Sequence, residues 1–127
     1  MLLVCRFTVL EPDVADFTAR ASRALELLIA RPGCRRGLLS QSMDEADRWV
    51  LTVEFESVVA YRRALSPFEV REHVIPLLSE AMVDEPAAYE PLLVAENGGV
   101  TRQVSLLAQD AGTVRLGEAS GPTTTPR

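Results

Sequence analysis

The sequence predicts one α+β domain in which helices cover one face of an antiparallel sheet. Three observations predict it. Residues 2–10 and 48–56 alternate apolar and other side chains with the period of two that strands require. Between them, residues 14–30 repeat apolar side chains every three or four positions, as amphipathic helices do. A second helical pattern at 58–80 precedes another strand-like segment at 87–95.

The first strand, 2–10, directs Cys5 and Phe7 to a wholly apolar side, while its other side is mixed. A Glu-Pro-Asp sequence ends the strand, and Asp13 is a suitable N-cap for the helix that begins at Val14. The sequence Arg-Pro-Gly at 31–33 then ends this helix.

A weaker strand at 34–43, a polar turn at 44–47 and the strand at 48–56 form an antiparallel hairpin. The alternation in the last of these places Trp49 and Phe55 on the same side. Both aromatic side chains are therefore expected on the face of the sheet that the helices cover.

The helical pattern after this hairpin is interrupted twice. Ser66-Pro67 ends a first helix at about residue 65, and Ser66 with Glu69 has the spacing of a capping box for the next helix. Pro76 lies inside that second helix and is expected to kink it. With the strand predicted at 87–95, the order becomes β-α-β-β-α-β, which is the ferredoxin-like arrangement with two helices on one face.

The predicted domain spans 1–95, and residues 96–127 differ from it in composition. This tail contains five of the seven glycines and no aromatic residue, so we expect it to be largely disordered, with a weak hairpin at 103–116 as the exception considered. The uncovered face of a four-stranded sheet still carries apolar groups. We therefore expect a homodimer in which a second copy covers that face.

Composition excludes several classes of function. A net charge of −5 and a pI near 4.9 argue against nucleic-acid binding. No apolar run is long enough to cross a membrane and the N-terminus does not resemble a signal peptide, so we expect a cytoplasmic protein. Two distant cysteines and one histidine do not form a zinc site, and no glycine-rich loop suggests a flavin or nicotinamide cofactor.

Several short segments together resemble a known family. They are the opening strand, the Arg-Pro-Gly helix end, and the sequences Val53 to Ser57, Ala60 to Arg63 and Ser66 to Phe68. In this combination, over about residues 2–95, the chain resembles the antibiotic biosynthesis monooxygenase (ABM) domain. The resemblance implies a ferredoxin-like fold, and a dimer whose two sheets join into an α+β barrel.

The resemblance also implies candidate activities. The family includes cofactor-independent oxygenases of quinols and anthrones, and a haem-degrading branch whose site combines an asparagine, a tryptophan and an iron-ligating histidine. Cys5 stands at the asparagine position, Arg63 at the tryptophan position and His73 at the histidine position. In the quinol-oxidising branch a histidine commonly occupies the place of Arg63. The chain therefore keeps one of these site residues and departs from the others.

Three residues are candidates for catalysis. His73 is the only histidine; it could ligate haem iron or accept a proton, or it could be an exposed helix residue. Arg63 could bind a carboxylate or stabilise an anion, or it could be a solvated helix arginine. Tyr61 could donate a hydrogen bond to a substrate oxygen, or it could be half-buried packing. Cys5 is expected to be an inert buried thiol.

The sequence leaves three functions open. The first is a monooxygenase without a cofactor, acting with O2 on an aromatic, quinol or polyketide-like substrate. The second is a haem-binding or haem-degrading protein that uses His73, and the third is a dimeric ligand-binding or accessory domain without catalysis. We expect the substrate pocket between sheet and helices, where aromatic side chains would line it: Phe7, Trp49, Phe55 and Phe68.

Overall fold

The structure is a computed structural model, which describes residues 1–104. It divides into two compact units, Met1–Tyr89 and a second unit that begins at Glu90. The first contains a four-stranded sheet in the order β2-β3-β1-β4, formed by β1 (Leu2–Thr8), β2 (Cys34–Gln41), β3 (Arg48–Phe55) and β4 (Ala88–Tyr89). All its strand pairs are antiparallel.

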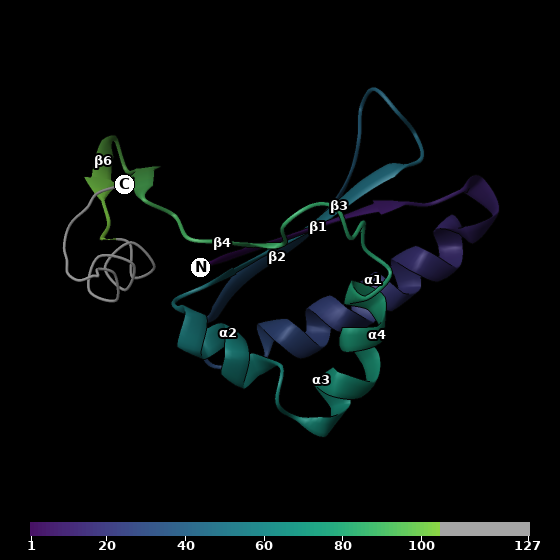
Figure 1. The fold of residues 1–127 in the computed structure, drawn as a ribbon, viewed down its shortest axis with the longest axis horizontal. Coiled ribbons are helices and arrows are strands. Elements are labelled where there is room, and N and C mark those ends of the chain that lie inside the picture. The colour runs from purple at the N-terminus through teal and green to yellow at the C-terminus, as the bar shows by residue number, and fades with distance from the viewer. Residues whose placement is uncertain (105–127) are drawn as a thin grey trace, which may run out of the picture. The chain divides into compact units, whose positions relative to one another are not determined.

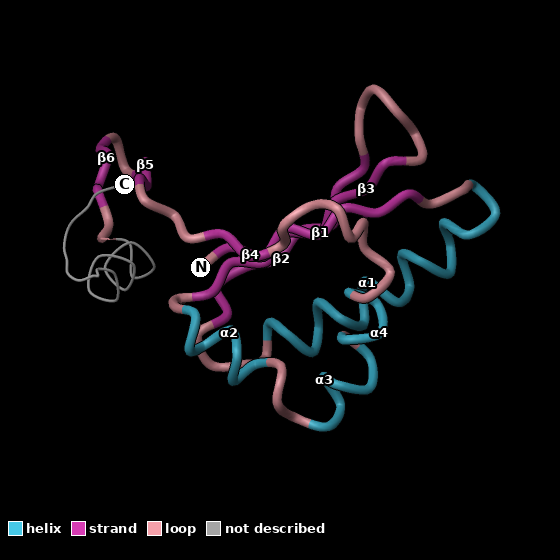
Figure 2. The backbone as a smooth tube through the Cα atoms, viewed as in Figure 1, coloured by secondary structure: helices cyan, strands magenta, loops and turns pink. Residues whose placement is uncertain are grey.

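The helices of the first unit lie on one face of this sheet, as Figures 1 and 2 show. They are α1 (Val14–Ile29), α2 (Val58–Ala64), α3 (Phe68–His73) and α4 (Ile75–Leu78), with a short 3-10 turn, η1 (Glu11–Asp13), before α1. The α+β fold with an antiparallel sheet and helices on one face is therefore confirmed. The helical pattern predicted at 58–80 forms three separate helices, α2, α3 and α4.

The core lies between α1 and the sheet. The alternate side chains of β1 and β3 that face the helices are almost completely buried. Two small residues of α1, Ala21 and Ala24, have no exposed surface, so the helix backbone can approach the sheet closely. Side chains from α3, α4 and the residue between them join the same core, and the largest fully buried side chains of the unit come from all of these elements: Leu3, Leu28, Leu51, Val53, Phe55, Val70, Val74 and Leu77.

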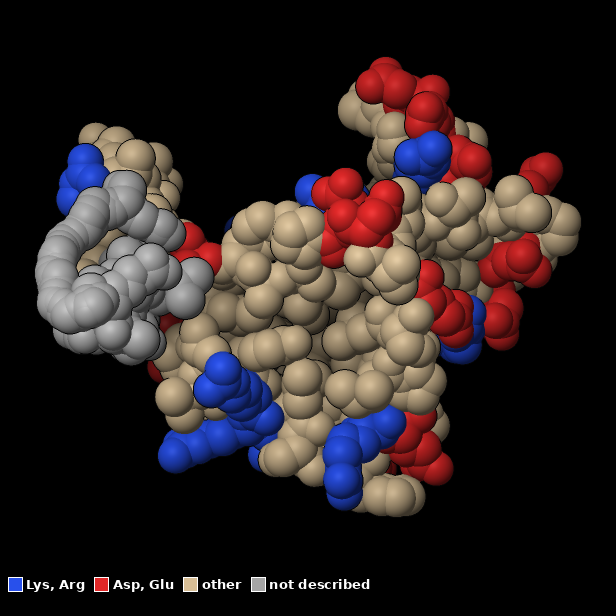
Figure 3. Space-filling view, in the orientation of Figure 1, with Lys and Arg blue, Asp and Glu red and all other residues tan. Residues whose placement is uncertain are grey.

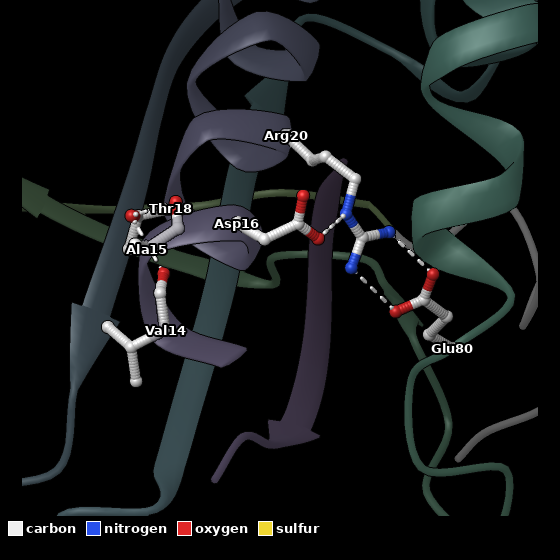
Figure 4. Close-up of polar contacts among 6 residues, drawn as sticks. All are labelled: Val14, Ala15, Asp16, Thr18, Arg20 and Glu80. Atoms are coloured by element: carbon white, nitrogen blue, oxygen red, sulfur yellow. Dashed lines mark hydrogen bonds and ion pairs between the residues drawn. The ribbon is translucent and has the colours of Figure 1, made fainter. Parts of the chain in front are cut away.

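An ion-pair network joins α1 to the turn after α4. The guanidinium of Arg20 donates to both carboxylate oxygens of Glu80, at 2.6 and 3.1 Å, and its Nε donates to Asp16 at 3.0 Å (Figure 4). In the same view the Thr18 hydroxyl bonds back to the carbonyls of Val14 and Ala15. These side chains are partly exposed, so the network fixes geometry more than it adds stability.

Helix ends agree with the sequence in part. The Ser66-Pro67 break is observed, and so is the interruption caused by Pro76, which lies in the first turn of α4 so that the helix breaks at Val74. Ser66 does not cap α3, however: Pro67 occupies the N-cap, and the Ser66 hydroxyl donates to the Arg63 carbonyl. Ser57 caps α2 instead, by accepting from the Ala60 amide at 3.1 Å.

The predicted strand at 87–95 is wrong as a single element. Only Ala88 and Tyr89 pair with β1. Leu93–Glu96 forms β5, which pairs with β6 (Gly99–Arg102) in a separate two-stranded hairpin. Asn97 and Gly98 supply the positive φ angles of its turn, which is the sequence signal for a two-residue hairpin loop. The weak hairpin expected at 103–116 lies outside the described residues except for its first two positions.

Gly33 is required where α1 turns into β2. Its φ is +85°, and a Cβ placed there would lie 2.6 Å from the Cβ of Ala60 on α2. Gly37 provides a matched position, because a Cβ there would also meet an atom at 2.6 Å, but that atom is the flexible Cδ2 end of Leu25.

We therefore expect Gly33→Ala to lower the free energy of unfolding by about 2 kcal/mol or more, through backbone strain together with the clash. Gly37→Ala should cost clearly less, because Leu25 can move. Urea unfolding of both variants and the wild type measures the difference. Equal losses in the two variants would contradict this account of the turn.

Candidate functional site

Tyr61 lies on the side of α2 that faces the sheet. It is half-buried, and its ring packs edge-on against Phe55 of β3, with ring centroids 5.4 Å apart. Burial raises the pKa of the Tyr61 phenol above its ordinary value of 10.0, Cys5 raises this pKa further, and Arg62 opposes the shift. Among the described residues the phenol hydroxyl has no hydrogen-bond partner. Tyr61 is thus a neutral donor that is free to bond a ligand oxygen.

Cys5 has the largest effect of any ionisable group on the pKa of Tyr61. Its side chain is 3% exposed on the helix-facing side of β1. Burial raises the pKa of the thiol above its ordinary value of 9.0, and Arg6 only partly opposes this. The thiol is therefore protonated at neutral pH and contributes an apolar wall more than a nucleophile.

The other predicted aromatic residues do not share this location. Phe7 and Trp49 lie opposite each other on β1 and β3, where both pack with Phe17 of α1. Trp49 and Phe55 are six residues apart on one strand, which corresponds to about 20 Å. Phe68 begins α3 and is 69% exposed. The structure thus forms two separate aromatic groups, and sequence reasoning missed Phe17 in the first.

Arg63 lies on the other side of α2 from Tyr61. Two positions along a helix correspond to a rotation of about 200°, so the two side chains leave the helix in nearly opposite directions. Arg63 lines a pocket of about 330 Å³ together with Arg31 and Glu56. The structure therefore does not bring Arg63 and Tyr61 together.

His73 ends α3 on the outer side of the helices. Its side chain is 45% exposed, and its Nε2 lies 3.4 Å from a carboxylate oxygen of Glu72. With Arg20 and Arg23 of α1 it lines an open pocket of about 280 Å³. That volume lies below the range of about 300–1,000 Å³ typical of small-molecule sites, and haem needs a large enclosed one. A haem role for His73 stays a prediction that this geometry does not favour.

A larger cavity of about 520 Å³ lies between α1 and the edge strand β2. Its walls are mostly apolar and include Leu25, Ile29, Cys34 and Leu39. Sequence reasoning missed it, although Leu25 and Ile29 form a second apolar stripe beside the core stripe of α1. Cys34 is the one thiol there, and burial raises its pKa also.

The space-filling view shows a hollow between α2 and α4 on the face that carries the helices (Figure 3). The atoms around the hollow belong to residues without charge, whereas basic groups gather over α2 and α3. Tyr61 belongs to the helix on one side of this hollow. An uncharged hollow next to the helix that carries Tyr61 is suited to a small ligand with an oxygen acceptor.

Fold and site together define a small ferredoxin-like domain in which a half-buried tyrosine lies on a helix beside an uncharged hollow. The model of one family, antibiotic biosynthesis monooxygenase, matches residues 1–74, and the chain belongs to this family. No curated protein matches the chain.

Two solved structures illustrate the likeness. SnoaB, a cofactor-independent oxygenase from Streptomyces nogalater, is 26% identical, with 63% of this chain and 80% of that chain covered and a TM-score of 0.54. Rv0793 from Mycobacterium tuberculosis is 19% identical, with 83% of this chain and 93% of that chain covered and a TM-score of 0.54. At this identity the second comparison supports the fold alone.

The sequence predicts neither a zinc site nor a membrane-spanning segment, and both features can be looked for among the described residues. In residues 1–104 there is no group of three or more His, Cys, Asp or Glu side chains arranged to hold a metal ion. Within the same residues no helix combines the length and the hydrophobicity that crossing a bilayer requires. The cytoplasmic location stays a prediction.

The shifted pKa of Cys5 predicts how stability changes at alkaline pH. The folded protein keeps the thiol proton at pH values where the unfolded chain has lost it, so the unfolded state binds fewer protons. The contribution is complete below pH 9.0, and the free energy of unfolding falls as pH rises through the folded pKa. Tyr61 acts in the same direction above pH 10.0.

Urea unfolding under reducing conditions between pH 8 and pH 10.5 measures this fall. Cys5→Ala should flatten the decline, and Cys34→Ala, which removes the more exposed thiol, should flatten it less. A wild-type free energy of unfolding that stays constant over this range would contradict the burial of the Cys5 thiol.

Proposed function

We propose that this protein is a cofactor-independent monooxygenase of the ABM type that acts on a small quinol or polyketide-like aromatic substrate. The observation that carries the proposal is the half-buried Tyr61 side chain, whose ring packs on Phe55 under α2 and whose hydroxyl has no hydrogen-bond partner among the described residues. Family membership and the 26% identity to SnoaB, a cofactor-independent oxygenase, support the reaction class.

The chemistry needs little from the protein. An anthrone or hydroquinone that loses its acidic proton to solvent as it binds becomes an electron-rich anion, which reacts with O2 without a metal or flavin. When an anthrone CH2 group is oxidised to a carbonyl, one oxygen atom enters the product and the other leaves as water, so no external reductant is needed. The protein must exclude water and stabilise the substrate oxyanion.

Tyr61 is the residue that we assign to the oxyanion. Its raised pKa keeps it protonated near neutral pH, so it can donate a hydrogen bond to the developing negative charge but cannot act as the base. Phe55 holds the Tyr61 ring in place from below. Arg63 and His73 point away from this layer, and the proposed mechanism uses neither.

Oxygen consumption with a panel of anthrones and hydroquinones tests the proposal. Tyr61→Phe removes one hydroxyl and leaves the packing on Phe55, so kcat should fall by about 10²-fold. His73→Ala is the matched control, because its side chain is exposed on the outer side of α3, and it should keep the wild-type rate.

Two results would overturn the assignment. A Tyr61→Phe variant with full activity would remove Tyr61 from the mechanism. Saturable binding of the panel compounds to the wild type, without oxygen consumption, would identify a ligand-binding domain and not an enzyme.

We further propose that the protein is a homodimer joined through the uncovered face of its sheet. Strand register places the apolar side chains of Leu2, Val4, Val50 and Tyr89 on that face, with Leu38 beside them on β2. Leu38 is 46% and Tyr89 is 37% exposed. A second copy that covers this face would bury these groups, in agreement with dimers joined by their sheets in the family.

Val4→Arg should convert the dimer to a monomer, because it places one buried charge per copy at the centre of the interface. Leu10→Arg is the control, since Leu10 is 60% exposed and lies beyond the end of β1. Sedimentation velocity measures the oligomeric state, and circular dichroism verifies that both variants fold. A wild type that is monomeric at micromolar concentration would refute the dimer.

A further inference from the structure

Arginines without acidic partners gather around α2. In a chain with a net charge of −5, five of the eleven described arginines have a carboxylate within 4 Å, and three of the other six lie on α2 or in the turn beside it. Arg31, Arg62 and Arg63 have no carboxylate within that distance among the described residues. Figure 3 shows basic groups over α2. Half of the unpaired arginines among the described residues thus lie on or beside one short helix, and such a concentration of positive charge in an acidic protein favours an anionic ligand there.

Two of these arginines share one pocket. Arg31 reaches it from the turn after α1, and Arg63 from α2. The turn lies against the helix because Gly33 packs on Ala60 without a side chain between them. The pocket has a volume of about 330 Å³, at the lower end of the range of about 300–1,000 Å³ for small-molecule sites.

Arg31 supplies the second and independent observation. Its Nε atom is buried and has no hydrogen-bond partner. Buried donors without acceptors are rare in folded proteins because the loss of water is not compensated. The lining of the pocket therefore includes a residue with a donor that lacks its acceptor.

Charge and shape define the class of ligand. Glu56 also lines the pocket but lies more than 4 Å from both guanidinium groups, so the three side chains together leave one positive charge. A planar guanidinium matches a carboxylate with two parallel hydrogen bonds. Pro32, Val59 and Ala64 provide apolar surface in the same pocket for the body of the ligand.

We propose that the pocket between the Arg31–Gly33 turn and α2 binds a small molecule through a single carboxylate group, held by Arg31 and Arg63. This site is on the opposite side of α2 from Tyr61. It is therefore independent of the proposed oxygenase site, and either can exist without the other.

Calorimetric titration of the full chain with benzoate tests the proposal, with inorganic phosphate as the competing anion. Arg63→Gln should weaken benzoate binding about tenfold or more, because it removes a charged hydrogen-bond donor. Arg62→Gln is the matched control: it makes the same charge change one position away on α2, but Arg62 does not line the pocket. It should change affinity less than about twofold.

Arg31→Lys and Tyr61→Phe complete the test. Arg31→Lys keeps the charge but replaces the planar guanidinium that can form two parallel hydrogen bonds, so it should also weaken benzoate binding, whereas Tyr61→Phe should leave the affinity unchanged. Absence of saturable benzoate binding, equal losses in Arg62→Gln and Arg63→Gln, or tighter binding of phosphate than of benzoate would each overturn the carboxylate site. Loss of benzoate binding in Tyr61→Phe would place the ligand in the oxygenase recess instead and would also overturn it.

Discussion

The rest of the structure depends on one buried layer, formed where α1 packs on the helix-facing side of β1 and β3. Ala21 and Ala24 let the helix approach the sheet closely, so alternate strand residues fill the space between them. Because side chains alternate strictly along a strand, this packing fixes which side every residue of β1 and β3 faces. Cys5 is buried under the helices, and Arg6 is directed to the other face, for this reason alone.

The orientation of α2 follows from the same layer and separates two kinds of chemistry. Tyr61 must face Phe55, because its ring completes the layer at the end of β3. The helical rotation then directs Arg63 outward, toward the turn that contains Gly33. A helix of seven residues thus presents a neutral donor to an apolar recess on one side and a cation to a polar pocket on the other.

Membership of the ABM family establishes the fold of this chain, whereas the residues of its own site decide which reaction is assigned to it. The fold is shared with SnoaB and Rv0793, yet fold alone does not fix a reaction. What this chain adds is specific to its residues: within 1–104, a phenol without a hydrogen-bond partner, a buried thiol whose charge would act on it, and arginines around α2 without an acidic partner. The reaction assigned to it therefore rests on Tyr61 more than on the histidine that matches a position in one branch of the family.

The sequence by itself determined the elements and the faces within each element. Alternation predicted β1 and β3, the apolar repeat predicted α1, and the interruptions at Pro67 and Pro76 were read directly from proline chemistry. The same alternation predicted that Cys5 is buried. These features are local, since each depends on residues a few positions apart.

Only the tertiary structure decided which residues meet. It separated Tyr61, Arg63 and His73, which the sequence had offered together as candidates for catalysis, because spacing along the chain does not determine which neighbour packs on which helix face. It also ended β4 after Tyr89 and paired the next strand with β6, a choice that apolar content alone could not make. The pocket of Arg31 and Arg63 exists because Gly33 lets two segments far apart in sequence come into contact.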